Sequence, residues 1–142
     1  MLRDISVSLN KLGNVERDAG NLSSAAAAYR QSLKLNRQLR ASLGDLPQAL
    51  RYLSISLDTL GDFEGAVGNL PAATAAYRES VEIRRQLRAS LGDIPQALRD
   101  LSVSLNRLGL VDRKAGNFPA AMEAYRESLE LSRQLRVSLG DT

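Results

Sequence analysis

Serine and carboxylate side chains are the residues of this chain that could do chemistry. The chain contains no His and no Cys, so the usual general base for a serine nucleophile is missing, and so is a thiol nucleophile. The serines recur in pairs at a constant interval, which indicates packing or helix surface rather than catalysis. We therefore expect no enzymatic activity. The recurring serines are Ser6, Ser8, Ser54, Ser56, Ser102 and Ser104.

The carboxylates of Asp58, Asp62 and Glu64 are the strongest candidates for a metal site. They follow one another at i, i+4 and i+6 on one expected helix, without the glycine pattern of a cation-binding loop. A glycine-rich phosphate loop is absent as well. The sequence therefore predicts neither a metal site nor a cofactor.

All of these residues lie within an internal repeat. Gly20, Gly68 and Gly116 stand 48 residues apart, and the sequence around each is nearly the same. A fixed period of this size is typical of a solenoid, in which each unit packs on its neighbours. We expect a single array over residues 1–142, divided into units of residues 2–49, 50–97 and 98–142.

Each unit has the pattern of two long helices joined by a short turn. Glycine followed by Asn or Asp closes each segment, because Gly just past a helix adopts the left-handed conformation and the next residue can cap the following helix. We expect Asp45 to be an N-cap, Pro47 to lie in the first turn and Gln48 to complete a capping box. Asn69 and Asn117 are expected to cap the second helices of their units.

Apolar residues recur at steps of three and four within these segments, which is the period of one face of a helix. Two amphipathic helices joined by a two-residue turn form an antiparallel hairpin, and such hairpins bury their remaining apolar surface by stacking. The predicted fold class is all-α: an α-solenoid of three stacked helix–turn–helix repeats with six long antiparallel helices. The composition agrees, because 44% of the residues are hydrophobic but only 4% are aromatic.

The charge balance does not favour a nucleic-acid partner. The chain has 19 basic and 16 acidic residues, and basic clusters with interleaved aromatic residues are missing. Arginines of the expected second helices stand three or four residues from glutamates, which predicts salt bridges on a solvated helix face. These pairs are Arg78–Glu82, Glu82–Arg85, Arg126–Glu130 and Glu130–Arg133.

Nothing in the sequence indicates a membrane or a secretory route. No apolar run approaches the roughly 18 residues of a membrane span, and residues 1–20 lack the apolar core of a signal peptide. The absence of Cys gives no indication of an oxidising compartment. We expect a cytoplasmic protein without a membrane partner.

One motif of six positions recurs in all three units and resembles the tetratricopeptide repeat. In the third unit it consists of Leu105, Leu108, Gly109, Gly116, Ala121 and Tyr125. We expect the glycine after the second leucine to let the paired helices approach closely, with the tyrosine beside it. The long helices are similar to those of kinesin light chains and bacterial multi-repeat proteins. The units depart from the family where an aromatic residue is usual, at Glu16, Glu64 and Asp112.

The resemblance implies a scaffold for protein–protein interaction, with a peptide or partner helix bound in a concave groove lined by the first helices. Asn10 and Asn106 suit recognition of a peptide backbone, because an amide both donates and accepts. The central unit is acidic between basic neighbours, which fits a peptide with a basic centre; ordinary variation of a solvent-facing surface is the alternative. The candidate binding residues are Asn10, Asn14, Arg17, Asp58, Asp62, Asn106, Arg107 and Arg113.

The two ends of the array favour self-association. Terminal repeats normally carry a polar outer face, but the last helix is expected to expose Leu129, Leu135 and Leu139. Copies of the chain could then stack head to tail or pair about a twofold axis, giving a homo-oligomer. Two explanations stay open: the chain is a segment of a longer array, or it is a self-assembling unit, whose near-identical repeats also fit a consensus design.

Overall fold

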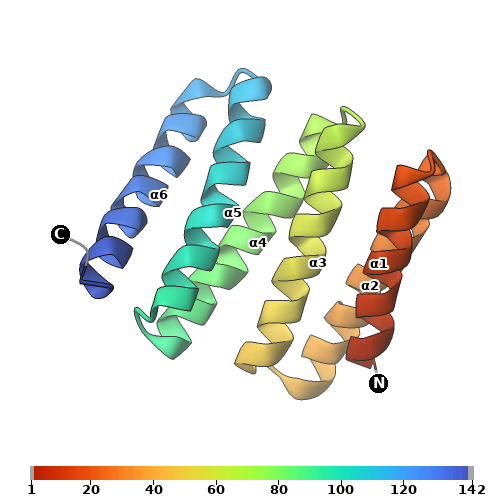
Figure 1. Ribbon diagram of the computed structural model, residues 1–142, viewed down its shortest axis with the longest axis horizontal. Coiled ribbons are helices and arrows are strands. Elements are labelled where there is room, and N and C mark those ends of the chain that lie inside the picture. Colours follow the sequence, from red (N-terminus) through yellow and green to blue (C-terminus); the bar gives the residue numbers. More distant parts are fainter. Residues whose placement is uncertain (1, 141–142) are drawn as a thin grey trace.

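The computed structural model describes residues 2–140 of the chain. These residues form six α-helices joined by short turns (Figure 1). They are α1 (Leu2–Asp18), α2 (Leu22–Leu43), α3 (Pro47–Ala66), α4 (Leu70–Leu91), α5 (Pro95–Lys114) and α6 (Phe118–Ser138). Consecutive helices form three antiparallel hairpins, which stand side by side in chain order. Neighbouring hairpins pack through α2 with α3 and through α4 with α5. The prediction of an all-α solenoid of three stacked repeats is confirmed.

The turn inside each hairpin depends on a glycine with a left-handed backbone. Gly20, Gly68 and Gly116 have φ angles of 84°, 87° and 81°, a region that residues with a Cβ rarely adopt. At the first turn, the N–H of Asn21 donates to the carbonyl oxygen of Glu16 at 2.8 Å, which is the long bond of a Schellman motif. The glycine stops read from the sequence are therefore confirmed.

A glycine in each first helix lies directly against the tyrosine of the paired helix. A Cβ added at Gly13 would lie 2.6 Å from a ring carbon of Tyr29, and one added at Gly61 would lie 2.7 Å from Tyr77. The third hairpin has the same arrangement. Such distances are shorter than any van der Waals contact, so the close packing of the two helices requires glycine. The expectation drawn from the recurring glycine and tyrosine is confirmed.

Buried serines join the two helices of every hairpin. In each unit the hydroxyl of a second-helix serine donates to the carbonyl oxygen of a first-helix serine. The three bonds join Ser32 to Ser6, Ser80 to Ser54 and Ser128 to Ser102, at 3.0, 3.3 and 3.2 Å. Of the recurring serines on the first helices, Ser8 is exposed and the other five are buried, so packing and helix surface both account for them.

An N-cap at Asp45 would place the start of the next helix at Leu46, but the helix begins one residue later. α3 begins at Pro47, and its N-cap is Leu46, which makes no side-chain capping bond. Asp45 instead accepts a hydrogen bond from Nε of Arg40 at the end of α2, at 2.9 Å. The predicted cap and capping box are wrong here, because a guanidinium across the turn takes the carboxylate. The caps predicted for α4 and α6 are confirmed: Asn69 and Asn117 each accept from the N–H three residues later.

Arginines of the second helices pair across units as well as within one helix. Arg85 lies 3.6 Å from Glu82, as expected, but its shorter contact, 2.6 Å, is with Glu127 of the next unit. Arg78 lies 3.6 Å from Asp112 of α5 rather than beside Glu82. The reason is that stacking brings α4 next to α5 and α6, so that a long guanidinium side chain reaches the neighbouring hairpin. These ion pairs therefore link the units.

Candidate functional site

A pocket of about 520 Å³ lies between α3 and α5, with α4 contributing its inner wall. In Figure 1, α4 passes behind α3 and α5 where those two helices stand apart. We call this hollow the central pocket. Its apolar lining comes from all three helices: Pro47, Tyr52, Ile55, Leu87, Leu91 and Ala97. Its polar lining consists of Gln48, Arg51, Arg84, Gln96 and Asp100.

Arg84 supplies a buried charge to the central pocket. Its Nη2 donates to Oδ2 of Asp58 at 2.9 Å, and its Nη1 lies 3.4 Å from Oδ2 of Asp100. The approach to Asp100 is an ion pair without hydrogen-bond geometry, so Nε and Nη1 of Arg84 are buried and have no hydrogen-bond partner among the described residues. A buried donor without an acceptor is costly. Arg84 therefore retains hydrogen-bonding capacity beside the pocket.

Asp58 joins the second unit to the third. Besides Arg84, it accepts a hydrogen bond from Oγ of Ser104 at 3.2 Å and forms an ion pair with Arg107 at 3.5 Å. The residue is buried, and both of its charged partners come from other helices. A buried carboxylate is tolerated only with such partners. Asp58, which the sequence analysis places among the ligand-binding residues, therefore lies below the surface with its charge balanced.

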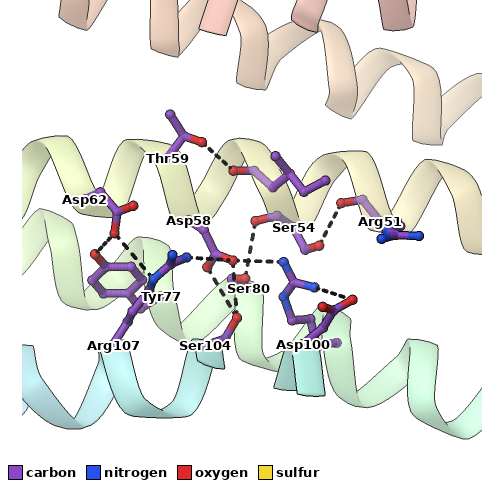
Figure 2. A network of polar contacts seen from close by, with 12 residues as sticks. Arg51, Ser54, Asp58, Thr59, Asp62, Tyr77, Ser80, Asp100, Ser104 and Arg107 are labelled. Carbon is purple, nitrogen blue, oxygen red and sulfur yellow. Dashed lines mark hydrogen bonds and ion pairs between the residues drawn. The ribbon is translucent and has the colours of Figure 1, made fainter. Parts of the chain in front are cut away.

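Asp62 lies at the other end of the same polar network (Figure 2). The hydroxyl of Tyr77 donates to its carboxylate, and Nε of Arg107 lies 3.8 Å from it. Burial, and then the hydrogen bond to Asp62, raise the pKa of Tyr77 well above its usual value. The phenol therefore stays protonated and continues to donate to Asp62. The structure thus brings Asp58, Asp62 and Arg107 together, as three of the predicted residues.

The remaining predicted residues lie apart from this network, on α1 and α5. Asn14 is exposed, and its side-chain oxygen accepts a hydrogen bond from the hydroxyl of Tyr29 at 2.6 Å. Asn10 is half-buried on the same helix, whereas Arg17 is exposed at its end. Asn106 and Arg113 are exposed on α5. These five side chains therefore lie on first helices to either side of α3.

Arg84 and Asp100 are site residues that the sequence analysis did not identify. The position of Arg84 is occupied by Asn36 in the first unit and by Ser132 in the third, so a charge appears there in one unit alone. The position of Asp100 is occupied by Tyr52 in the second unit. For Arg84, a buried position that changes its chemistry between otherwise similar units is the signal that could have identified it. Asp100 has an equivalent carboxylate at Asp4 in the first unit, so its sequence position carries no such signal.

The leucines expected at the outer end differ in their surroundings. Leu129 is exposed, although the equivalent residue of the second unit, Val81, is buried. Leu139 is 59% exposed, but its equivalents Leu43 and Leu91 are 48% and 43% exposed within the array. The exposure of Leu139 therefore follows from its place near the hairpin end, not from a missing neighbour. Leu135 is half-buried.

Residues 2–140 contain neither a metal-binding cluster nor a membrane-spanning helix. No group of three or more acidic, His or Cys residues in this part of the chain has an arrangement that could hold a metal ion. None of the described helices combines the length and the apolar character needed to cross a bilayer.

A family model of the tetratricopeptide repeat matches residues 6–40 and 101–136, which together make up half of the chain. The first segment covers most of the α1–α2 hairpin, and the second covers most of the α5–α6 hairpin. Both segments contain the glycine and tyrosine that pack against each other. No curated protein matches the chain.

Proposed function

Because the chain belongs to the tetratricopeptide repeat family, we propose that it is a protein-interaction scaffold that binds an extended segment of a partner protein across α1, α3 and α5. Repeats of this family generally mediate interactions between proteins. The observation that carries the proposal is the central pocket, which opens between two of these first helices and is largely apolar. Pockets that anchor a partner commonly combine such an apolar wall with a few polar groups.

The partner segment carries a large apolar side chain that enters the central pocket. Tyr52 and Ile55 of α3 face Leu87 and Leu91 of α4 across a volume of about 520 Å³, which is large enough for a Leu, Ile, Met or Phe side chain. Gln48 and Gln96 at the rim offer amides to the backbone of the segment. A hydrophobic anchor with polar groups around it gives both affinity and register.

An acidic residue next to that anchor fits better than a basic one. The basic-centre hypothesis depends on free carboxylates at Asp58 and Asp62, but both are paired with arginines. Arg51, in contrast, is exposed on the pocket lining, close to the first turn of α3, where the helix dipole also favours negative charge. We therefore propose a segment with an apolar residue followed or preceded by Asp or Glu.

The residues predicted on α1 and α5 complete the proposed surface. Asn10 and Asn106 lie on the helices that flank α3, and an amide side chain can both donate to and accept from an extended backbone. Arg17 and Arg113 are exposed basic residues on the same two helices. They would attract an acidic partner, with a contribution that decreases with salt.

The proposal is tested by probing an array of short random peptides with the labelled chain, at low and at high salt. The expected result is enrichment of peptides that contain a large apolar residue beside Asp or Glu. Ile55→Lys is expected to abolish their binding, because it places a charge in the apolar wall. Arg51→Glu is expected to remove the preference for acidic neighbours.

The chain offers a matched control for each variant. Val103 and Arg99 are the equivalents of Ile55 and Arg51 in the third unit, and neither lines the central pocket. Val103→Lys and Arg99→Glu should therefore leave peptide binding unchanged. Enrichment of unrelated peptides, or equal losses in the variants and their controls, would contradict the proposed site.

A further inference from the structure

The outer face of α6 has the character of an internal surface. In the first two units, the tyrosine and the aliphatic residue four positions later pack against the next first helix. Tyr77 and Val81 of α4, for example, lie in one cluster with Leu108 of α5. Their equivalents on α6, Tyr125 and Leu129, are exposed, and Leu129 is 50% exposed against 2% for Val81. Phe118 and Met122 extend this stripe along α6. We call it the α6 face.

The outer face of α1 is the complementary internal surface. Leu101, Leu108 and Val111 of α5 are buried against α4. The equivalent residues of α1 are Ile5, Leu12 and Val15, and all three are exposed; Leu12 is 51% exposed against 9% for Leu108. A shallow apolar hollow lies over part of this stripe, lined by Ile5, Leu9 and Leu12. We call the stripe the α1 face.

The α6 face and the α1 face carry the same charges as the ion pairs at the two internal junctions. At the junction of α4 with α5, Arg78 lies 3.6 Å from Asp112, and an Arg–Glu pair at 3.1 Å occupies the same positions between α2 and α3. The equivalent positions at the two ends of the array are Arg126 on α6 and Glu16 on α1. Joining the α6 face to the α1 face therefore brings opposite charges together, as both internal junctions do.

Side-chain volumes also match between the two faces. At the first junction, the small side chain of Ala26 lies in the same cluster as the large ring of Phe63. On the outer faces, the equivalent of Ala26 is the larger Met122, and the equivalent of Phe63 is the smaller Val15. The larger side chain thus lies on the first helix at the internal junction and on the second helix at the outer faces. The total side-chain volume of the pair stays similar, and packed interfaces tolerate such volume-conserving changes best.

We infer that the α6 face of one chain binds the α1 face of a second copy, repeating the packing of α4 on α5 between molecules. The interface is separate from the central pocket and goes beyond the proposed function. It is heterologous, because two different surfaces meet, and the operation that relates the copies is the one that relates the units. Such a contact leaves a free α6 face and a free α1 face at the two ends, so further copies add to the stack.

The first test is light scattering behind size-exclusion chromatography over a hundredfold range of concentration. The mass is expected to rise from 15.4 kDa with concentration and to pass beyond a dimer. A constant mass of one chain would overturn the inference. A mass that stops at a dimer would also overturn it, because that result indicates a closed twofold interface.

The second test uses two variants, each blocked on one face. Leu129→Arg places a charge on the α6 face, and Leu12→Arg places one on the α1 face; both leucines are exposed in the single chain, and circular dichroism checks that the helices are kept. Each variant alone is expected to stay monomeric at concentrations where the unaltered chain associates. Their mixture is expected to form a one-to-one pair and nothing larger, since each retains one complementary face.

Two comparisons make this result specific. Leu139→Arg carries the same charge on an exposed leucine of the α6 terminus outside the α6 face, and should associate as the unaltered chain does. Arg126→Glu should weaken association, and adding Glu16→Arg in the same chain should restore it. Association of Leu12→Arg with itself, or no rescue by the second charge change, would show that the two faces do not meet.

Discussion

At the scale of single residues, the contact between Gly61 and Tyr77 sets how closely the helices of a hairpin approach. The ring of Tyr77 is buried, so it has little room to move away from an added methyl group. Gly61→Ala is expected to lower the free energy of unfolding by about 1–3 kcal/mol, the usual cost of overpacking a filled core. Urea denaturation followed by circular dichroism measures the change.

Two other glycines serve as controls for this prediction. A Cβ at Gly65 would lie 3.8 Å from Cβ of Ala73, an ordinary contact, so Gly65→Ala should be neutral or stabilising by up to about 1 kcal/mol through helix propensity. Gly109→Ala should cost less than Gly61→Ala, because Tyr125 is exposed and its ring can turn away. Equal effects at all three glycines would refute the role of the tyrosine.

At the scale of helices, the buried pair of Asp58 and Arg84 joins α3 to α4 within the second unit, and Asp58 also accepts a hydrogen bond from Ser104 of the third unit. In the first unit, Asn36 occupies the equivalent of Arg84, and its side-chain N–H donates to the carbonyl oxygen of Tyr52 in the second unit at 3.2 Å. The same structural position is thus occupied by a charged pair in one unit and by neutral side chains in another. Near-identical helices can therefore stack with different polar chemistry.

The double variant Asp58→Asn with Arg84→Asn tests this account, because it copies the residues of the first unit, Asn10 and Asn36. Arg84→Asn alone is expected to cost about 3 kcal/mol or more, since it leaves a buried carboxylate without its nearest partner. The double variant should be less destabilised than the two single changes together, by a coupling energy of about 1–3 kcal/mol. Additive losses in chemical denaturation would mean that the pair does not act as a unit.

The beginning of α3 shows what helix-scale patterns miss. The order Asp45, Leu46, Pro47 fits a capped helix start, but the carboxylate binds Arg40 of the preceding helix. The pattern predicts that a helix starts near this point, because proline fits the first turn. The pattern does not show that the guanidinium of Arg40, at the end of α2, lies close enough to bind the carboxylate of Asp45.

At the scale of the whole molecule, the helices differ in how many neighbours they have. α3 and α4 each pack on their hairpin partner and on an adjacent hairpin, whereas α6 packs on α5 alone among the strong contacts. In an array stabilised by nearest neighbours, end units open more readily than central ones. Amide hydrogen exchange on the monomeric variant Leu129→Arg is therefore expected to be slowest in α3 and α4 and fastest in α1 and α6.

The same measurement on the unaltered chain provides the comparison. At concentrations where copies stack, α1 and α6 should gain protection, because each then acquires a neighbour. The gain should be missing in Leu129→Arg. Protection that is uniform along the monomeric chain would contradict the nearest-neighbour description of this array.

The repeat could be predicted from the sequence alone, and so could the six helices, the glycine turns and the contact between glycine and tyrosine. These features are local or lie within one hairpin. Each of them occurs in all three units, so a single irregular residue does not obscure the pattern. The packing of the hairpins, in contrast, sets the surroundings of Asp58, whose partners Arg84 and Ser104 lie 26 and 46 residues away in the chain. It also decides that α3 and α5 leave a pocket over α4. Which side chains of different hairpins meet depends on the rotation and spacing of the packed helices, and the repeat pattern does not specify these.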